Sequence, residues 1–278
     1  MMRSVRTDMA AELQRRHTGE LCGVRCKNES LNGLEVFTVD IFNKEGEEAL
    51  GKPQGCYYTL TLPRWFDRGS ENFPYAVEAL AALLARCMPA QHENVFVAAL
   101  GNPDITPDAL GSLAAASVLV TRHLKQEDKD SFPQFCTLAL CRPGVLGTSG
   151  IESAAQIKTL CRSLCPDVVV VIDALAGSEA ESLCRRVQVS NTGISPGSGV
   201  GNDRQELSKA TLGVPVISVG VPTVIDAGFL GEGSLSGMFV TPRDIDSMVR
   251  HCARLIGYAM NVALHHGLTI SDVDALIG

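Results

Sequence analysis

Two aspartates follow apolar runs at places where a folded sheet could bring them together. Asp108 lies in GNPDITPDALG, shortly after the apolar run VFVAAL at residues 95–100. Asp173 follows four valines and an isoleucine in VVVVIDALAG, residues 168–177. An aspartate at the end of so apolar a strand is partly desolvated, which favours its protonated form. Two carboxyl groups that differ in protonation can act as general base and general acid toward one substrate.

Each aspartate also has an ordinary structural interpretation. Asp108 can be a residue of a first helical turn, where the helix dipole stabilises a carboxylate. Asp173 can cap the helix that follows its strand. Because the sequence does not give the order of the strands in the sheet, spacing alone leaves both interpretations open.

Three alternating glycines mark a second stretch of interest. Gly197, Gly199 and Gly201 lie in NTGISPGSGVGNDRQELSK, residues 191–209. The dinucleotide-binding fingerprint is GxGxxG, and Asn202 occupies the place of its third glycine. Backbone N–H groups of such a loop can still approach a ligand closely. We therefore predict a structural or substrate-facing loop, with nucleotide or phosphate binding as the alternative.

The histidines and cysteines form no familiar catalytic or metal motif. Arg122 and His123 lie at the end of a predicted helix, where they could orient a carboxylate or cap the helix. The sequence contains neither HExxH nor GxSxG, so hydrolysis by zinc or by an activated serine has no motif to support it. The ten cysteines include CxxxC spacings and no CxxC zinc knuckle. We expect reduced thiols, no metal and no cofactor.

The elements that must position these residues alternate between strands and helices. Predicted strands cover residues 33–42, 56–62, 95–100, 135–141, 168–173, 186–190 and 214–220. Predicted helices cover residues 71–88, 107–124, 151–164, 204–213 and 242–266. This alternation indicates an α/β fold with a mainly parallel sheet and helices on both faces, extended by N-terminal strands. Ligands of such sheets bind beyond the carboxyl ends of the strands, where the two aspartates are expected.

The composition excludes some classes of function. The 278 residues carry a formal net charge of -7, so a broad electrostatic attraction to nucleic acid is not expected. No apolar run reaches the roughly 18 residues of a membrane span. The N-terminal stretch MMRSVRTDMAAELQRRH has basic residues but lacks the apolar region of a secretory signal. We therefore expect a cytoplasmic protein that contacts neither membrane nor nucleic acid directly.

Several longer stretches resemble the germination protease family of spore-forming bacteria. They occur in the family's order over most of residues 95–265, and SVRTDMAAE near the start matches as well. The stretches are GNPDITPDALG, VLVTRHL, RPGVLGTSGIES, VVVVIDALAG, TGISPGSGVGNDRQELSKATLGVPVISVGVPTVIDA, VTPRDID and NVALHH. The resemblance implies an unusual aspartic-type endopeptidase, unrelated in fold to pepsin and similar to hydrogenase-maturation endopeptidases. The family's proposed catalytic aspartates lie in TPDALG and IDALA, which here contain Asp108 and Asp173.

The resemblance also implies a substrate and a mode of activation. The family degrades small acid-soluble, DNA-binding spore proteins during germination, which places the protein in the forespore or spore core. Its members are zymogens that remove a short leader at a site similar to acidic–apolar–Ala–Ser–Glu. Asp8-Met9-Ala10-Ala11-Glu12 fits that pattern. We predict self-cleavage between Asp8 and Met9, which divides the chain into a leader, 1–8, and a single protease domain, 9–278.

The chain departs from the family pattern at several places. Pro103 stands where a tryptophan is common, and Asn191 and Ser195 replace the usual aspartate and histidine. The segment 228–239 replaces a long insertion. Members of the family tend to form tetramers, so a homotetramer is one expectation, although the shorter segment could alter the contacts. Two alternatives stay open: a hydrogenase-maturation-like endopeptidase that needs a metal on its substrate, and a non-catalytic α/β protein that binds a nucleotide or phosphate.

Overall fold

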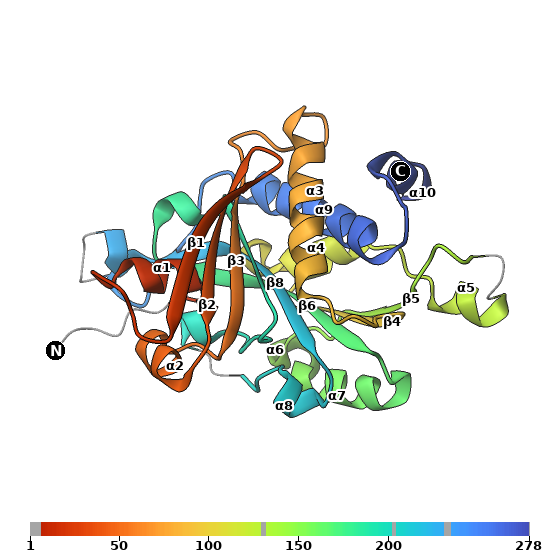
Figure 1. Ribbon diagram of the computed structural model, residues 1–278, viewed down its shortest axis with the longest axis horizontal. Coiled ribbons are helices and arrows are strands. Elements are labelled where there is room, and N and C mark those ends of the chain that lie inside the picture. Colours follow the sequence, from red (N-terminus) through yellow and green to blue (C-terminus); the bar gives the residue numbers. More distant parts are fainter. Residues whose placement is uncertain (1–6, 129–131, 202–203, 231–234, 278) are drawn as a thin grey trace.

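The computed structural model describes residues 7–128, 132–201, 204–230 and 235–277 (Figure 1). Within these residues nine strands form one sheet, in the order β1-β2-β3-β7-β8-β6-β4-β5, and β9 pairs with β8. The strands are β1 Val24–Leu31, β2 Leu34–Ile41, β3 Gly55–Thr61, β4 Asn94–Ala99, β5 Thr137–Cys141, β6 Val168–Gly177, β7 Arg186–Ser190, β8 Val216–Asp226 and β9 Phe239–Val240. The helices are α1 Ala10–Arg15, α2 Lys44–Leu50, α3 Asn72–Cys87, α4 Leu110–Ala114, α5 Arg122–Glu127, α6 Leu146–Ser149, α7 Ser153–Leu164, α8 Lys209–Leu212, α9 Ile245–Leu264 and α10 Ile270–Ile277.

The α/β class is confirmed, and the sheet is mixed. Strands β8, β6, β4 and β5 are parallel to one another. The N-terminal extension, β1 to β3, continues the sheet through antiparallel pairs with β7, which in turn pairs antiparallel with β8. Strand β1 was not predicted, because its sequence VRCKNESL is mostly polar and its residues are partly or fully exposed. The parallel half of the sheet is the half that carries both aspartates.

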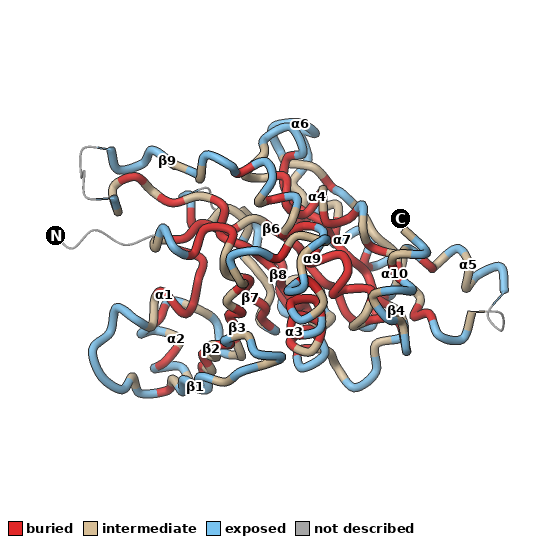
Figure 2. Tube along the Cα trace, turned by 90° about the horizontal axis from the view of Figure 1, so that it is seen from above, coloured by how far each residue is buried: buried red, intermediate tan, exposed pale blue. Residues whose placement is uncertain are grey.

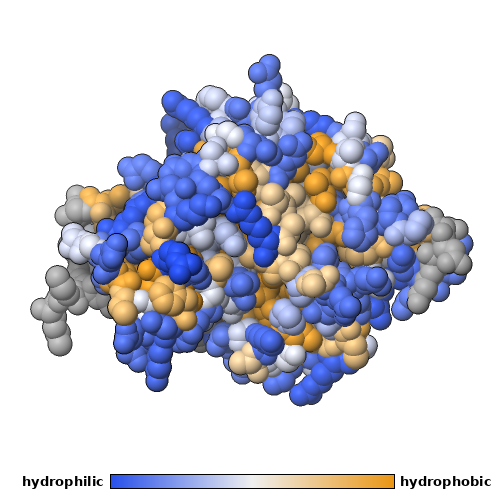
Figure 3. Space-filling view, viewed as in Figure 1, coloured by the Kyte–Doolittle hydropathy of each residue, from blue (hydrophilic) through white to orange (hydrophobic). Residues whose placement is uncertain are grey.

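Helices cover both faces of the sheet, as the alternation predicted. Helices α3, α4 and α9 lie on one face, and α7 and α8 lie on the other (Figure 1). Strand β6 is buried on both sides: Val168 and Val170 pack into the larger hydrophobic core, and Val169 and Val171 pack into the smaller one. The buried trace runs through the middle of the molecule in Figure 2. The face seen in Figure 3 is largely hydrophilic, with apolar residues showing toward its centre.

The predicted helix 107–124 is wrong as one continuous element. A 3-10 turn, Thr106–Asp108, precedes α4, and a second, Ala115–Ser117, ends this helical stretch before α5 begins. Asn261 of α9 stabilises the interruption, because its Oδ1 accepts from the N–H of Leu119 at 2.8 Å and its Nδ2 donates to the carbonyl of Ser117 at 2.8 Å. A long-range side-chain contact thus supplies the break that the local apolar pattern does not predict.

Two further elements differ from the prediction. The predicted helix 204–213 is reduced to α8, because Leu207 forms an isolated bridge with Ile194 instead. Strand β6 does not end at Asp173 but continues to Gly177, with a register shift after Leu175. Asp173 is therefore an internal strand residue and does not cap a helix.

Candidate active site

Asp108 and Asp173 lie at the same edge of the sheet and line one cleft. Asp108 closes the 3-10 turn that follows β4, and Asp173 belongs to β6. Strands β4 and β6 are parallel neighbours, with Ala99 opposite Ile172, so the two carboxyl groups follow equivalent positions of adjacent strands. The cleft has a volume of about 490 Å³, and both aspartates contribute to its wall. The folded chain thus brings both aspartates to one cleft, and their action as a pair stays a prediction.

The loop that carries Asp108 is packed closely onto the strands. Gly101 has a φ of 101°, and a Cβ there would lie 1.8 Å from the carbonyl oxygen of Asp108. A Cβ at Gly111 would lie 2.3 Å from the carbonyl oxygen of Leu100 and 2.7 Å from that of Ile172. Only glycine allows either approach, so these two glycines of GNPDITPDALG fix the height of Asp108 above the sheet.

The surroundings of Asp108 act on its carboxyl group in opposite directions. Its Oδ2 accepts a hydrogen bond of 2.8 Å from the backbone N–H of Asn102. Burial raises the pKa of Asp108 above its ordinary value, and the Asn102 N–H and the charge of Arg204 offset this only in part. Arg204 lines the same cleft and forms an ion pair of 3.3 Å with Glu152. Asp108 is thus partly desolvated but keeps contacts that favour its ionised form.

Asp173 has the stronger preference for the protonated form. The residue is 5% exposed. Burial, followed by the charges of Asp108 and Asp8, raises its pKa well above the ordinary value, and the N–H of Ala174, which donates to Oδ1 at 3.0 Å, opposes this only in part. The cleft therefore contains a pair of carboxyl groups in which Asp173 is the preferred holder of a proton. Such a pair can supply a base and an acid at neutral pH.

The predicted cleavage site lies against the same cleft. Asp8 is 8% exposed, and Met9, Ala10 and Ala11 are fully buried. The N–H of Asp8 donates to the carbonyl of Ala176 at 2.9 Å, and its Oδ2 accepts from the N–H of Ala176 at 2.9 Å. Asp8 thus extends the hydrogen bonding of β6 just beyond Asp173. Residues 1–6 of the predicted leader lie outside the described residues.

Gln188 of β7 holds the peptide group on either side of Met9. Its Nε2 donates to the carbonyl of Asp8 at 3.1 Å, and its Oε1 accepts from the N–H of Ala10 at 2.8 Å. Gln188 was not among the predicted site residues. A signal was present, because it is the one amide in the strand RVQVS and lies on the face opposite Val187 and Val189.

The other end of the cleavage-site sequence is held as firmly. Oε2 of Glu12 accepts from the N–H of Ser178 at 2.7 Å, from its hydroxyl at 2.8 Å, and from the hydroxyl of Thr7 at 2.6 Å. Both acidic residues of the pattern, Asp8 and Glu12, are thus bound by donors of β6 and its following turn.

The Gly-rich loop positions Asp8 directly. Ser198 donates its hydroxyl to Oδ1 of Asp8 at 2.7 Å. Gly197 and Gly201, on either side, have φ values of 75° and 72°. A Cβ at Gly199 would lie 2.3 Å from Oδ2 of Asp8 and 2.6 Å from the Cβ of Ala176. The three glycines therefore bring this loop against the residue that precedes the predicted cleavage point.

Other predicted residues lie elsewhere. Arg122 donates to Oδ1 of Asn94 at 3.2 Å, at the start of β4, which is the end of the strand away from the cleft. Neither Arg122 nor His123 lines the cleft. Residues 231–234 of the segment 228–239 lie outside the described residues, and Phe239, in β9, lines the cleft.

Residues 7–128, 132–201, 204–230 and 235–277 contain no group of three or more His, Cys, Asp or Glu side chains arranged to hold a metal ion. No helix in the same ranges is long and apolar enough to cross a membrane.

Comparisons with known proteins give one consistent result. The family model for germination proteases matches residues 3–236. The germination protease of Caldanaerobacter subterraneus subsp. tengcongensis is 33% identical, over 98% of this chain and 98% of the relative. That of Clostridium perfringens is 33% identical, over 99% and 100% of the two chains, and that of Clostridium acetobutylicum is 34% identical over the same shares.

One solved structure was found by comparison of the folds. The NiFe hydrogenase maturation protease HycI from Thermococcus kodakarensis KOD1 aligns with 64% of this chain and 99% of its own, at 18% identity and a TM-score of 0.37.

Proposed function

The chain belongs to the germination protease family and is a peptidase, and on that premise we propose that it is an aspartic-type endopeptidase in which Asp108 and Asp173 act as a pair. One observation carries the proposal: a carboxyl group from β6 and one from the turn after the neighbouring parallel strand β4 line one cleft, and the charge of Asp108 contributes to the raised pKa of Asp173. Of the two alternatives left open by the sequence, the non-catalytic nucleotide- or phosphate-binding protein does not agree with membership of a family of proteases.

In the proposed mechanism the two carboxyl groups begin in different states. Asp108, ionised, takes a proton from a water molecule while the water oxygen bonds to the carbonyl carbon of the peptide. Asp173, protonated, donates a hydrogen bond to the carbonyl oxygen and stabilises the negative charge that develops there, while it keeps its proton. When the C–N bond breaks, the proton on Asp108 passes to the leaving amine, and the carbonyl of the new carboxyl group forms again. The charges of the pair return to their starting arrangement.

The chain also acts on itself in this proposal. Cleavage of the Asp8–Met9 bond would release the leader, 1–8, and leave a protease domain, 9–278. The placement of Asp8 against the cleft, and the contacts of its carbonyl and carboxylate with Gln188 and Ser198, support this. N-terminal sequencing of the active protein would test it, because an active chain that still begins with Met1 would contradict self-processing.

The substrates that we propose are the small acid-soluble, DNA-binding spore proteins of the forespore or spore core, degraded at germination. The homotetramer stays a prediction, which sedimentation of the full chain would test.

The decisive experiment compares single carboxyl substitutions. Purified chains with Asp108→Asn or Asp173→Asn are incubated with a peptide of the Glu-Ile-Ala-Ser-Glu type, and cleavage is followed by mass spectrometry. Asp104→Asn is the matched control, because Asp104 is an exposed aspartate of the same loop. We expect a loss of at least about 1,000-fold in both cleft variants and little change in the control. Retained cleavage in both cleft variants would refute the mechanism, and cleavage that stops with a chelator would favour the metal-dependent alternative.

A further inference from the structure

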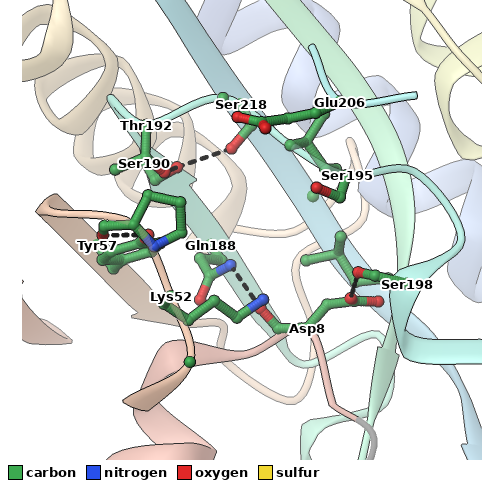
Figure 4. A pocket seen from close by; sticks show the side chains of 16 residues that line it. Asp8, Lys52, Tyr57, Gln188, Ser190, Thr192, Ser195, Ser198, Glu206 and Ser218 are labelled. Carbon is green, nitrogen blue, oxygen red and sulfur yellow. Dashed lines mark hydrogen bonds between the residues drawn. The ribbon is translucent and has the colours of Figure 1, made fainter. Parts of the chain in front are cut away.

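A second, smaller cavity adjoins the cleft. Its volume is about 160 Å³, and most of the residues that line it have polar side chains (Figure 4). Hydroxyl groups of Tyr57, Ser190 and Ser218 contribute to it. Asp8 and Leu175 line both this cavity and the cleft, so they form the wall between the two. The mechanism proposed above makes no use of this cavity.

Lys52 brings a positive charge into the second cavity. It follows Gly51, which ends α2 in the left-handed conformation with a φ of 62°, and this turn directs the side chain inward. Part of the residue remains accessible at the surface, but its amino group points toward Asp8 (Figure 4). Burial lowers the pKa of Lys52, and the charge of Asp8 opposes this change.

The ammonium group of Lys52 has no direct partner within the described chain. No hydrogen bond or ion pair involves it there; its electrostatic interaction with Asp8 acts over a longer distance. Glu206, which also lines the cavity, is an exposed residue. An ammonium group has three donors, and keeping a buried one without a partner is unfavourable. The chemistry of the site therefore suits an anionic ligand.

The place of Asp8 indicates which anion that is. The Asp8 carboxylate is bound by the hydroxyl of Ser198 and the N–H of Ala176. When Asp8 leaves with the leader, these two donors lose their acceptor. Asp8 is then also absent from the wall between the cleft and the second cavity. The Ser198 hydroxyl and the Ala176 N–H then border the space in which the acidic side chain lay, and Lys52 supplies a positive charge from the adjoining cavity.

We propose that Lys52, Ser198 and the Ala176 N–H form a subsite for the side-chain carboxylate of the substrate residue that precedes the cleaved bond. This subsite rests on the proposed endopeptidase function and makes Lys52 a specificity-determining residue.

The test uses full-length chains and combines changes at both partners. Leader release is followed by mass spectrometry in chains with Asp8 or Asp8→Asn, each with Lys52 or Lys52→Met. With Lys52 present, Asp8→Asn should slow release roughly 10-fold to 100-fold, as expected for loss of an interaction with a charged group. With Lys52→Met the same change should have less than about a third of that effect on a logarithmic scale.

Peptides provide the second arm of the experiment. The Glu-Ile-Ala-Ser-Glu peptide and its counterpart with Gln in first position are given to the chain with Lys52, Lys52→Arg or Lys52→Met. The preference for Glu, as a ratio of kcat/KM, should fall by about 10-fold or more in Lys52→Met, mainly through KM, and be largely kept in Lys52→Arg. Urea unfolding of each chain shows whether the fold is retained.

The two proposals fail in different ways. An equal effect of Asp8→Asn in both Lys52 backgrounds, or an unchanged preference for Glu in folded Lys52→Met, would overturn the subsite and leave the endopeptidase intact. If the unsubstituted chain cleaved neither its leader nor the Glu peptide, the endopeptidase proposal would fail and the subsite with it.

Discussion

Replacing Gln188 by methionine should loosen the cleavage-site segment from the sheet. Methionine has a similar length but cannot donate or accept in the way an amide does. The change leaves the carbonyl of Asp8 and the N–H of Ala10 without their partner. Because Gln188 is 6% exposed, water cannot easily replace the amide. A buried polar group without a partner costs about 1–3 kcal/mol, so two such groups should lower the free energy of unfolding by about 2–6 kcal/mol.

Urea unfolding measures this loss directly. All chains carry Asp108→Asn, so that the leader stays attached during the measurement. Gln156→Met is the matched control, because within the described residues its side chain makes one hydrogen bond, to the carbonyl of Pro143 at 3.0 Å and not to the leader. The control should cost about 1 kcal/mol. A loss below about 1 kcal/mol in Gln188→Met would show that Gln188 does not hold Asp8 and Ala10 in solution, and would refute the reasoning.

Two further predictions concern the same cleft. Because Asp173 binds a proton more tightly in the folded chain than in the unfolded one, its ionisation should weaken the fold as the pH rises above the ordinary carboxyl value of 3.8. Asp173→Asn should therefore stabilise the chain near neutral pH and lose that advantage below pH 3.8. Urea unfolding of both chains at several pH values measures the difference in their free energies of unfolding. A difference that does not change with pH would contradict the prediction. Gly199→Ala should cost roughly 1–3 kcal/mol, because its Cβ would lie 2.3 Å from Oδ2 of Asp8, whereas Gly147→Ala, with open space around it, should cost little; equal unfolding midpoints would contradict this.

Local sequence was sufficient to find the catalytic candidates. The unbroken β-branched run before Asp173 predicts a strand buried on both faces, and the two hydrophobic cores confirm that burial. The alternation of strands and helices, joined to the apolar run before Asp108, predicts that both residues lie at the same edge of a parallel sheet. The structure pairs β4 directly with β6. The strands and their burial could be predicted because both depend on the pattern of apolar residues along consecutive positions of the chain.

Tertiary structure decided what surrounds the pair. Strand β8 lies between β7 and β6, so Gln188 and Asp173 belong to strands that are not neighbours, and no local pattern predicts their relation. The interruption of the predicted helix 107–124 likewise depends on Asn261, more than a hundred residues away.

The residues around the second cavity also come together only through the tertiary structure. Lys52 follows a turn, Ser198 lies in a Gly-rich loop, and Asp8 lies near the start of the chain. The sequence marks Asp8 through its resemblance to the cleavage pattern, but nothing in the sequence relates it to Lys52 or Ser198. They meet because the N-terminal segment bonds to the end of β6 while the loop after β7 folds over it. The sequence by itself therefore determined the buried strands and the two aspartates, since these depend on local hydrophobic pattern. Only the order of the strands and the long-range hydrogen bonds could bring Asp8, Lys52 and Gln188 to them.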